Sequence, residues 1–288
     1  MIERILPSGV ATAVAYGDPD TPDGLLPEEE AHIRRAVPAR RQEYATARRC
    51  ARGALADLGL PPVPLPTGPS GAPRWPDGIT GSITHCRGYR AAAVARTTGT
   101  AALGIDAERH LPLPEGGLKV IAHDEELRSL TRLERAHPGI RWDTLLFSAK
   151  EAVYKAWFPR FPRKLSFRDA SLAFRTGPAG TSGTFTARLL VPDSPYRRFE
   201  GRWIVAEGLV ATAVHLAAPS PGDADRRPGH AGGVVRPLAC PTGTPFARGD
   251  SAKRLDAPLP NQDRTEAALP AIGAAEERGR SWGASGPA

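Results

Sequence analysis

The chain has 288 residues, of which 41% are hydrophobic, enough for one large or two modest domains with a sizeable core. It contains no apolar run as long as a membrane-spanning helix, and its start, Met1 to Pro7, lacks the apolar region of a signal peptide. Three widely spaced cysteines exclude a disulfide framework and a paired-cysteine metal site. We therefore expect a cytoplasmic protein.

The formal net charge of +7 favours anionic partners, which include nucleotides, acidic proteins, membranes and nucleic acids. Zinc-finger spacing and a repeated basic-aromatic pattern are both missing from the sequence. We therefore expect neither nucleic acid nor a membrane as the partner.

The first part of the chain predicts helices followed by strands. Proline and acidic residues at 27–30 predict a helix start, and Pro38 should break or restart that helix. A second helix, with a strongly basic polar side, should run from about residue 40 to 58. A loop rich in proline and glycine then covers 61–81, and residues 82–85 form the end of a short strand.

Two carboxylates follow on a predicted strand. A strand-like run at 91–95 and a turn at 98–100 lead into a returning strand over 101–108. Side chains alternate along a strand, so Asp106 and Glu108 should point the same way. Two carboxylates side by side repel each other unless a cation lies between them. Carboxylates are hard oxygen ligands, which suit Mg²⁺. A solvated strand end is the alternative interpretation of an Asp-x-Glu pattern.

A third carboxylate lies on a predicted helix over 142–157, where apolar residues recur at helical spacing. Glu151 and Lys155 are four residues apart, so they are neighbours on the helix surface and can meet one ligand together. A solvent-exposed pair that only supports the helix is the alternative. The hypothesis of a functional pair becomes stronger when Glu151 is taken together with Asp106 and Glu108.

The second part of the chain repeats the order of helices and strands. A helix is predicted over 122–136 and the next over 142–157, followed by strand-like runs at 170–175, 183–191 and 203–215. Because each half combines helices with antiparallel strands, we predict an α+β protein.

The predicted units are an N-terminal half over 1–110, a C-terminal half over 111–218 and a tail over 219–288. The tail is rich in proline and glycine and has no sustained periodicity. By composition we predict that it is disordered.

Four sequence blocks occur in a fixed order. They are RRQEYATARRCAR at 40–52, GSITHCRGY at 81–89, GIDAE at 104–108 and FSAKEAVYKA at 147–156. In this combination the chain resembles the 4'-phosphopantetheinyl transferases, in particular the Sfp-type branch and its actinobacterial members, over roughly residues 1 to 217. The resemblance implies two similar α/β halves with a pseudo-twofold relation and an active site at their interface.

The resemblance also implies an activity. Members transfer the 4'-phosphopantetheine arm of coenzyme A to a serine of an apo acyl or peptidyl carrier protein, releasing 3',5'-ADP and giving the holo carrier. They serve fatty acid, polyketide, nonribosomal peptide or siderophore biosynthesis and are usually monomers. Two alternatives remain: a binding module that holds coenzyme A or a carrier without catalysis, and a Mg²⁺-dependent phosphodiesterase that transfers to water.

Individual roles follow from the resemblance. Asp106, Glu108 and Glu151 would hold Mg²⁺, or Mn²⁺ in its place, and Asp106 would also contact coenzyme A. Glu151 would act as the base that activates the carrier serine. Lys155 and Lys150 would stabilise the phosphates and the leaving 3',5'-ADP.

Further residues would contact the phosphates of coenzyme A. These are Arg40, Arg48, Arg74, Thr84 and His85. On its own, a lone histidine is more often structural, and only the resemblance favours binding for His85. Relatives often carry a lysine near the position of Thr67, which cannot supply that charge. Either Arg74 compensates or the other basic residues carry more of the binding.

Overall fold

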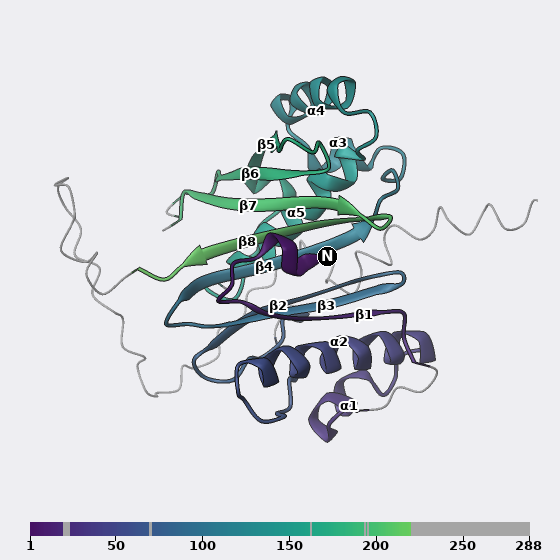
Figure 1. Ribbon diagram of the computed structural model, residues 1–288, viewed down its shortest axis with the longest axis vertical. Coiled ribbons are helices and arrows are strands. Elements are labelled where there is room, and N and C mark those ends of the chain that lie inside the picture. The colour runs from purple at the N-terminus through teal and green to yellow at the C-terminus, as the bar shows by residue number, and fades with distance from the viewer. Residues whose placement is uncertain (20–23, 69–70, 162, 193, 195, 220–288) are drawn as a thin grey trace, which may run out of the picture.

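The computed structural model describes residues 1–19, 24–68, 71–161, 163–192, 194 and 196–219. Two antiparallel sheets lie next to each other, each with its main helix on one side (Figure 1). The predicted α+β class is thus confirmed, while the pseudo-twofold relation stays a prediction. The predicted disordered tail at 219–288 lies outside the described residues, except for its first position. No helix in the described part of the chain has the length and apolar character needed to cross a membrane.

The N-terminal sheet has the strand order β1-β3-β2 and carries the long helix α2. Both faces of β3 are buried, and its run of alanines lets α2 approach closely on one face. The elements in chain order are η1 (Ile2–Ile5), β1 (Ala11–Tyr16), α1 (Pro27–Ile33), α2 (Pro38–Asp57), β2 (Ile79–Cys86) and β3 (Tyr89–Arg96).

The C-terminal sheet has the order β4-β8-β7-β6-β5 and is covered by α5. Its core is aromatic: the Trp142 ring lies edge-on to the Trp203 ring at 5.4 Å and also contacts Phe174. The elements are β4 (Thr100–Arg109), α3 (Gly117–Ile121), α4 (Asp124–Ala136), α5 (Trp142–Trp157), η3 (Phe167–Asp169), β5 (Ala170–Thr176), β6 (Ser182–Leu189), β7 (Arg198–Ala206) and β8 (Leu209–Ala217).

Two strand predictions need correction. The predicted strand over 203–215 is a hairpin of β7 and β8, because Glu207 and Gly208 both adopt positive φ (55° and 73°) and reverse the chain. The strand expected to return beside β3 instead pairs with β8, from Thr100 to Arg109. The predicted domain boundary between 110 and 111 stays a prediction, but by pairing β4 belongs with the C-terminal strands.

Gly104 brings β4 into direct contact with α5. A Cβ atom at this position would lie 2.0 Å from the Ala152 carbonyl oxygen and 2.6 Å from the Ala156 nitrogen. No larger residue fits between strand and helix here. The alternation of β4 places Asp106 on the same face, next to the C-terminal turns of α5.

Candidate active site between the two sheets

The predicted carboxylates and lysine of β4 and α5 meet at the contact between these elements. The Lys155 ammonium donates to Asp106 Oδ1 at 2.7 Å, and the Asp106 side chain is only 4% exposed. The other oxygen, Asp106 Oδ2, is buried and has no hydrogen-bond partner among the described residues. One side of this carboxylate is therefore neutralised by the protein and the other is left for an external group.

Within the cluster, the two residues of α5, Glu151 and Lys155, differ in how their pKa values shift. Burial raises the pKa of Glu151 to about 7, Lys155 opposes this shift, and the negative charge of Asp106 adds to it. Burial alone would lower the pKa of Lys155, but the carboxylates of Asp106, Glu151 and Glu108 outweigh burial and raise it. Lys155 therefore stays an ammonium, while Glu151 changes protonation state near neutral pH.

The cluster offers oxygen donors of the type that Mg²⁺ prefers. Within the described ranges, no group of three or more His, Cys, Asp or Glu side chains is arranged so that it could hold a metal ion on its own. Mg²⁺ usually keeps several waters and binds through one or two carboxylates plus substrate phosphates, so a closed cage is not required. The unpartnered Asp106 Oδ2 fits such an open site.

A second group of charges lies on α2 and β2. The Glu43 carboxylate accepts a hydrogen bond from Arg40 at 2.6 Å, lies 2.9 Å from His85 Nδ1, and lies 3.4 Å from Arg90. Arg90 also bonds to Asp18 at 2.7 Å. Burial alone would raise the pKa of Glu43, but His85 and Arg40 outweigh burial and lower it to about 2. Glu43 is thus a buried counter-ion for Arg40 and Arg90, and it also lies next to His85.

Arg48 lies further along α2 and is 4% exposed. Its guanidinium donates to the Leu65 carbonyl at 2.7 Å and to Thr67 Oγ1 at 3.1 Å, and it lies 4.2 Å from the centre of the Tyr44 ring. Tyr44 also bonds to the Thr67 hydroxyl at 2.9 Å. The threonine at the position where relatives often carry lysine therefore anchors the loop to α2. Arg74, on the same loop, is exposed.

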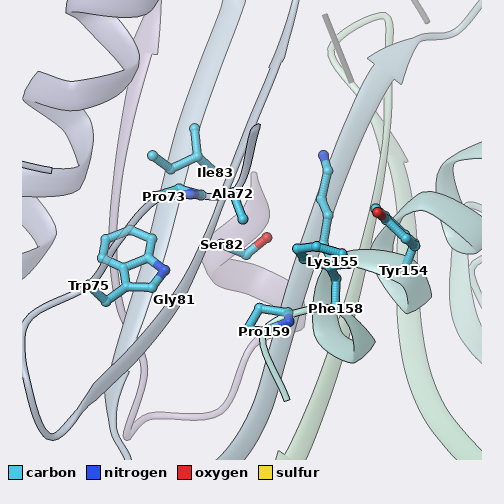
Figure 2. A pocket seen from close by; sticks show the side chains of 10 residues that line it. All are labelled: Ala72, Pro73, Trp75, Gly81, Ser82, Ile83, Tyr154, Lys155, Phe158 and Pro159. Carbon is cyan, nitrogen blue, oxygen red and sulfur yellow. The ribbon is translucent and has the colours of Figure 1, made fainter. Parts of the chain in front are cut away.

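A pocket opens between the two halves (Figure 2). One wall is formed by Trp75, Gly81 and Ser82, and the other by Tyr154, Lys155 and Phe158 at the end of α5. The Lys155 side chain extends beyond the pocket, with its nitrogen at the end far from Phe158 and Pro159. Lys155 therefore links this pocket to the cluster, because it lines the pocket and its ammonium binds Asp106.

The structure does not bring Lys150 to this site. Its ammonium is buried and donates to four oxygens of the C-terminal half, which are Ile121 O, Glu126 Oε2, Phe167 O and Ala170 O, at 2.7–2.9 Å. An ammonium has only three hydrogens, so none is left for a phosphate. The expected phosphate contact of Lys150 stays a prediction, and in this structure Lys150 joins α3, α4, η3 and β5 to α5.

Thr84 lies on β2 and contacts Asp106. Its hydroxyl donates to Asp106 Oδ1 at 3.2 Å and accepts the Ala107 N–H at 3.0 Å. A hydroxyl has one hydrogen, and in this structure it is directed at Asp106. The expected direct contact of Thr84 with coenzyme A stays a prediction, and within the protein Thr84 contacts the aspartate.

Sequence reasoning missed three buried residues that organise the site. Glu43 was within a recognised block, and its spacing of three from Arg40 was a usable signal. Ser82 adjoins Thr84 at the strand spacing of two. Glu126, 1% exposed, is the partner of Lys150, and an acid at the third position of a helix is typical of a capping box.

Comparison with known proteins identifies the family of the chain. The family model of the 4'-phosphopantetheinyl transferase N-terminal domain matches residues 28–95, and that of the 4'-phosphopantetheinyl transferase superfamily matches residues 102–203. The chain is 53% identical to the 4'-phosphopantetheinyl transferase Svp of Streptomyces mobaraensis, over 76% of this chain and 91% of that protein. It is 45% identical to the transferase PptT of Mycobacterium tuberculosis, over 75% and 98%. It is also 45% identical to the transferase Npt of Nocardia iowensis, over 75% and 100%. The chain therefore belongs to the 4'-phosphopantetheinyl transferase family.

Proposed function

We propose that the protein transfers the 4'-phosphopantetheine arm of coenzyme A to a serine of an apo acyl or peptidyl carrier protein, releasing 3',5'-ADP. The observation that carries this proposal is the pairing of a permanently charged Lys155 with a Glu151 whose pKa lies near 7. Phosphoryl-type transfer needs a fixed positive charge for the phosphates and a base for the attacking hydroxyl, and the site offers both.

Glu151 is the proposed base. In the metal-free protein burial raises the pKa of Glu151 to about 7, which makes its carboxylate a stronger proton acceptor than that of an ordinary glutamate. It removes the proton of the carrier serine as the serine oxygen bonds to the β-phosphorus. The bond from that phosphorus to the bridging oxygen breaks, and 3',5'-ADP leaves with the electron pair.

Lys155 is the proposed stabiliser of this charge. Its ammonium lies 2.7 Å from Asp106 Oδ1, so its position is fixed before the substrate arrives. We expect Asp106, Glu108 and Glu151 to hold Mg²⁺, or Mn²⁺ in its place, which when bound would neutralise charge on the pyrophosphate.

The basic side chains of α2 and β2 are the proposed site for the remaining phosphate of coenzyme A. Arg40 and His85 both contact Glu43, so they are held together in the absence of substrate. A phosphate would bind the outer donors of this group. Arg48 supports the neighbouring loop through Thr67, and Arg74 is exposed on that loop.

We further propose a cytoplasmic monomer that meets its carrier in solution, without a nucleic-acid or membrane partner. A basic protein attracts an acidic carrier, which speeds the encounter.

The test is intact-mass spectrometry of an apo carrier protein incubated with coenzyme A, Mg²⁺ and the protein. We expect the carrier to gain the mass of one phosphopantetheine group. Glu151→Gln should slow the transfer by at least about 100-fold, because general base catalysis contributes on this scale. Glu125→Gln, an exposed change on α4, is the matched control and should keep the parent rate.

Two results would contradict the proposal. Release of 3',5'-ADP with no change in carrier mass would favour a phosphodiesterase that transfers to water. Binding of coenzyme A without any product from several carriers would favour a binding module.

A further inference from the structure

The two sheets face each other along β2 and β4, but no backbone–backbone hydrogen bond joins these strands within the described residues. Two side-chain hydroxyls of β2 take the place of a ladder. Ser82 Oγ accepts the Ile105 N–H at 3.0 Å, and Thr84 Oγ1 accepts the Ala107 N–H at 3.0 Å. Buried N–H groups need partners, so these hydroxyls fix the position of β4 relative to β2.

These two contacts between β2 and β4 lie on either side of Asp106. The two N–H groups involved belong to the residues directly before and after this aspartate. Ser82 and Thr84 are 4% and 1% exposed, so water does not compete for these contacts. Figure 2 shows the Ser82 hydroxyl pointing from β2 toward the side of the pocket formed by α5. The backbone on both sides of the carboxylate is thus held by the opposite half of the protein.

The hydrogen bonds to the carboxylate itself are one-sided. Thr84 and Lys155 both donate to Asp106 Oδ1, at 3.2 Å and 2.7 Å. Asp106 Oδ2 is buried without a partner among the described residues, and an unpaired buried carboxylate oxygen is costly. The two donors therefore fix the rotation of the carboxylate and leave one chosen oxygen for an external cation.

We propose that Thr84 is a positioning residue, which acts through Asp106 to present Oδ2 to a divalent cation, and that Ser82 supports it by fixing the backbone before Asp106. This inference rests on the proposed function, because that function supplies the cation. It replaces a direct contact of Thr84 with coenzyme A by an indirect role in metal binding. Outer hydrogen bonds to metal ligands typically control about 10- to 100-fold in metal affinity or activity.

The experiment uses the full chain and four substitutions. Thr84→Val removes the hydroxyl at nearly constant shape, and Thr84→Ser restores it without the methyl group. Ser82→Ala removes only the backbone contact. Thr46→Val is the matched control, because Thr46 is fully buried and its hydroxyl bonds only within α2, to the Gln42 carbonyl.

Two quantities are measured for each variant: binding of Mn²⁺ alone, by the electron paramagnetic resonance signal of the free ion, and the Mg²⁺ concentration that gives half-maximal transfer. For Thr84→Val we expect both to weaken by about tenfold or more, with the KM for coenzyme A changed less than twofold. For Thr84→Ser and Thr46→Val, both metal measurements should stay within twofold of the parent. For Ser82→Ala, both should fall between the values of the parent and those of Thr84→Val. Circular dichroism confirms that each variant is folded.

Three results would overturn the inference. In the first, Thr84→Val raises the KM for coenzyme A but leaves both metal measurements unchanged, as a direct substrate contact predicts. In the second, Thr84→Ser weakens Mn²⁺ binding and raises the Mg²⁺ requirement as much as Thr84→Val does, so the methyl group matters and the hydroxyl does not. In the third, the parent does not bind Mn²⁺. Failure of the proposed function looks different: the parent binds Mn²⁺ and Thr84→Val weakens this binding, but no carrier is modified.

Discussion

The Glu151 carboxyl group experiences opposing effects, of which burial and the charge of Asp106 prevail over Lys155 and raise its pKa to about 7. In the unfolded chain the same group ionises near its ordinary value of 4.5. Between these two values the folded protein keeps a proton that the unfolded chain has released. The stability of the metal-free protein should therefore fall as the pH rises from about 4.5 to about 7.

Glu151→Gln removes this penalty, because the amide stays neutral at every pH. A shift of this size corresponds to roughly 3 kcal/mol at full burial, and partial exposure of Glu151 reduces it to on the order of 1 kcal/mol. In EDTA at pH 8, the midpoint temperature of thermal unfolding of Glu151→Gln should exceed that of the parent by about 2–4 °C. Near pH 4.5 the two midpoint temperatures should be equal. Glu125→Gln should show no such pH-dependent difference. An equal gain at both pH values would mean that ionisation of Glu151 does not cause the effect.

At the residue scale, the sequence predicts which side chains lie near one another where they belong to one regular element. The strand period placed Asp106 beside Glu108, and the helix period placed Glu151 beside Lys155. Lys150 shows where such reasoning fails. Lys150 directly precedes Glu151, so the two side chains point to different sides of α5. The buried partners of Lys150 come from α3, α4, η3 and β5, whose positions around α5 are set by tertiary contacts.

At the element scale, β4 and α5 are kept in register by Gly104. The atoms that a Cβ would meet belong to the helix backbone, which cannot move away as a flexible side chain would. Because Asp106 is two residues further along β4 and Lys155 is on the facing helix, any separation of the two elements also separates this ion pair.

Gly104→Ala should therefore reduce both stability and activity. We expect a loss of about 1–3 kcal/mol in the free energy of unfolding by urea, as overpacked cores show. The transfer rate should fall by more than tenfold, because a shift of about 1 Å in catalytic groups has effects of this size. Gly99→Ala is the control, since a Cβ at Gly99 meets nothing within 4 Å. A Gly104→Ala enzyme with the parent stability would mean that the helix and strand adapt without cost.

Element prediction also had clear limits. Helices with proline starts or a strong period were confirmed, including α5 over Trp142–Trp157. The partner of β4 was not predictable, because hydrophobic pattern defines the faces of a strand and not the neighbour along its edge. The hairpin at Glu207 was missed because the chain reverses there through a glutamate in a left-handed conformation, which is uncommon outside glycine.

At the scale of the whole molecule, the two sheets share a hydrophobic core. One cluster of buried residues combines Tyr89 and Ala91 of β3, Ile105 of β4, and Ile204 and Ala211 of the C-terminal hairpin. Residues of η1 complete this cluster from the start of the chain. Such a core does not divide at the boundary between 110 and 111, so we predict that the two halves unfold together.

Ile105→Ala tests this prediction, because Ile105 is fully buried in the shared cluster. Loss of its side chain should cost about 2–5 kcal/mol. Pulsed hydrogen exchange read by mass spectrometry, across a urea series, reports separately on peptides from α2 and from β6. In the parent both peptides should lose protection at one urea midpoint, and Ile105→Ala should lower both midpoints equally. Val120→Ala, at a side chain that is 68% exposed, should leave both unchanged. If α2 instead lost protection at a lower midpoint than β6, the halves would be independent domains, and the shared cluster would be a contact between them and not a common core.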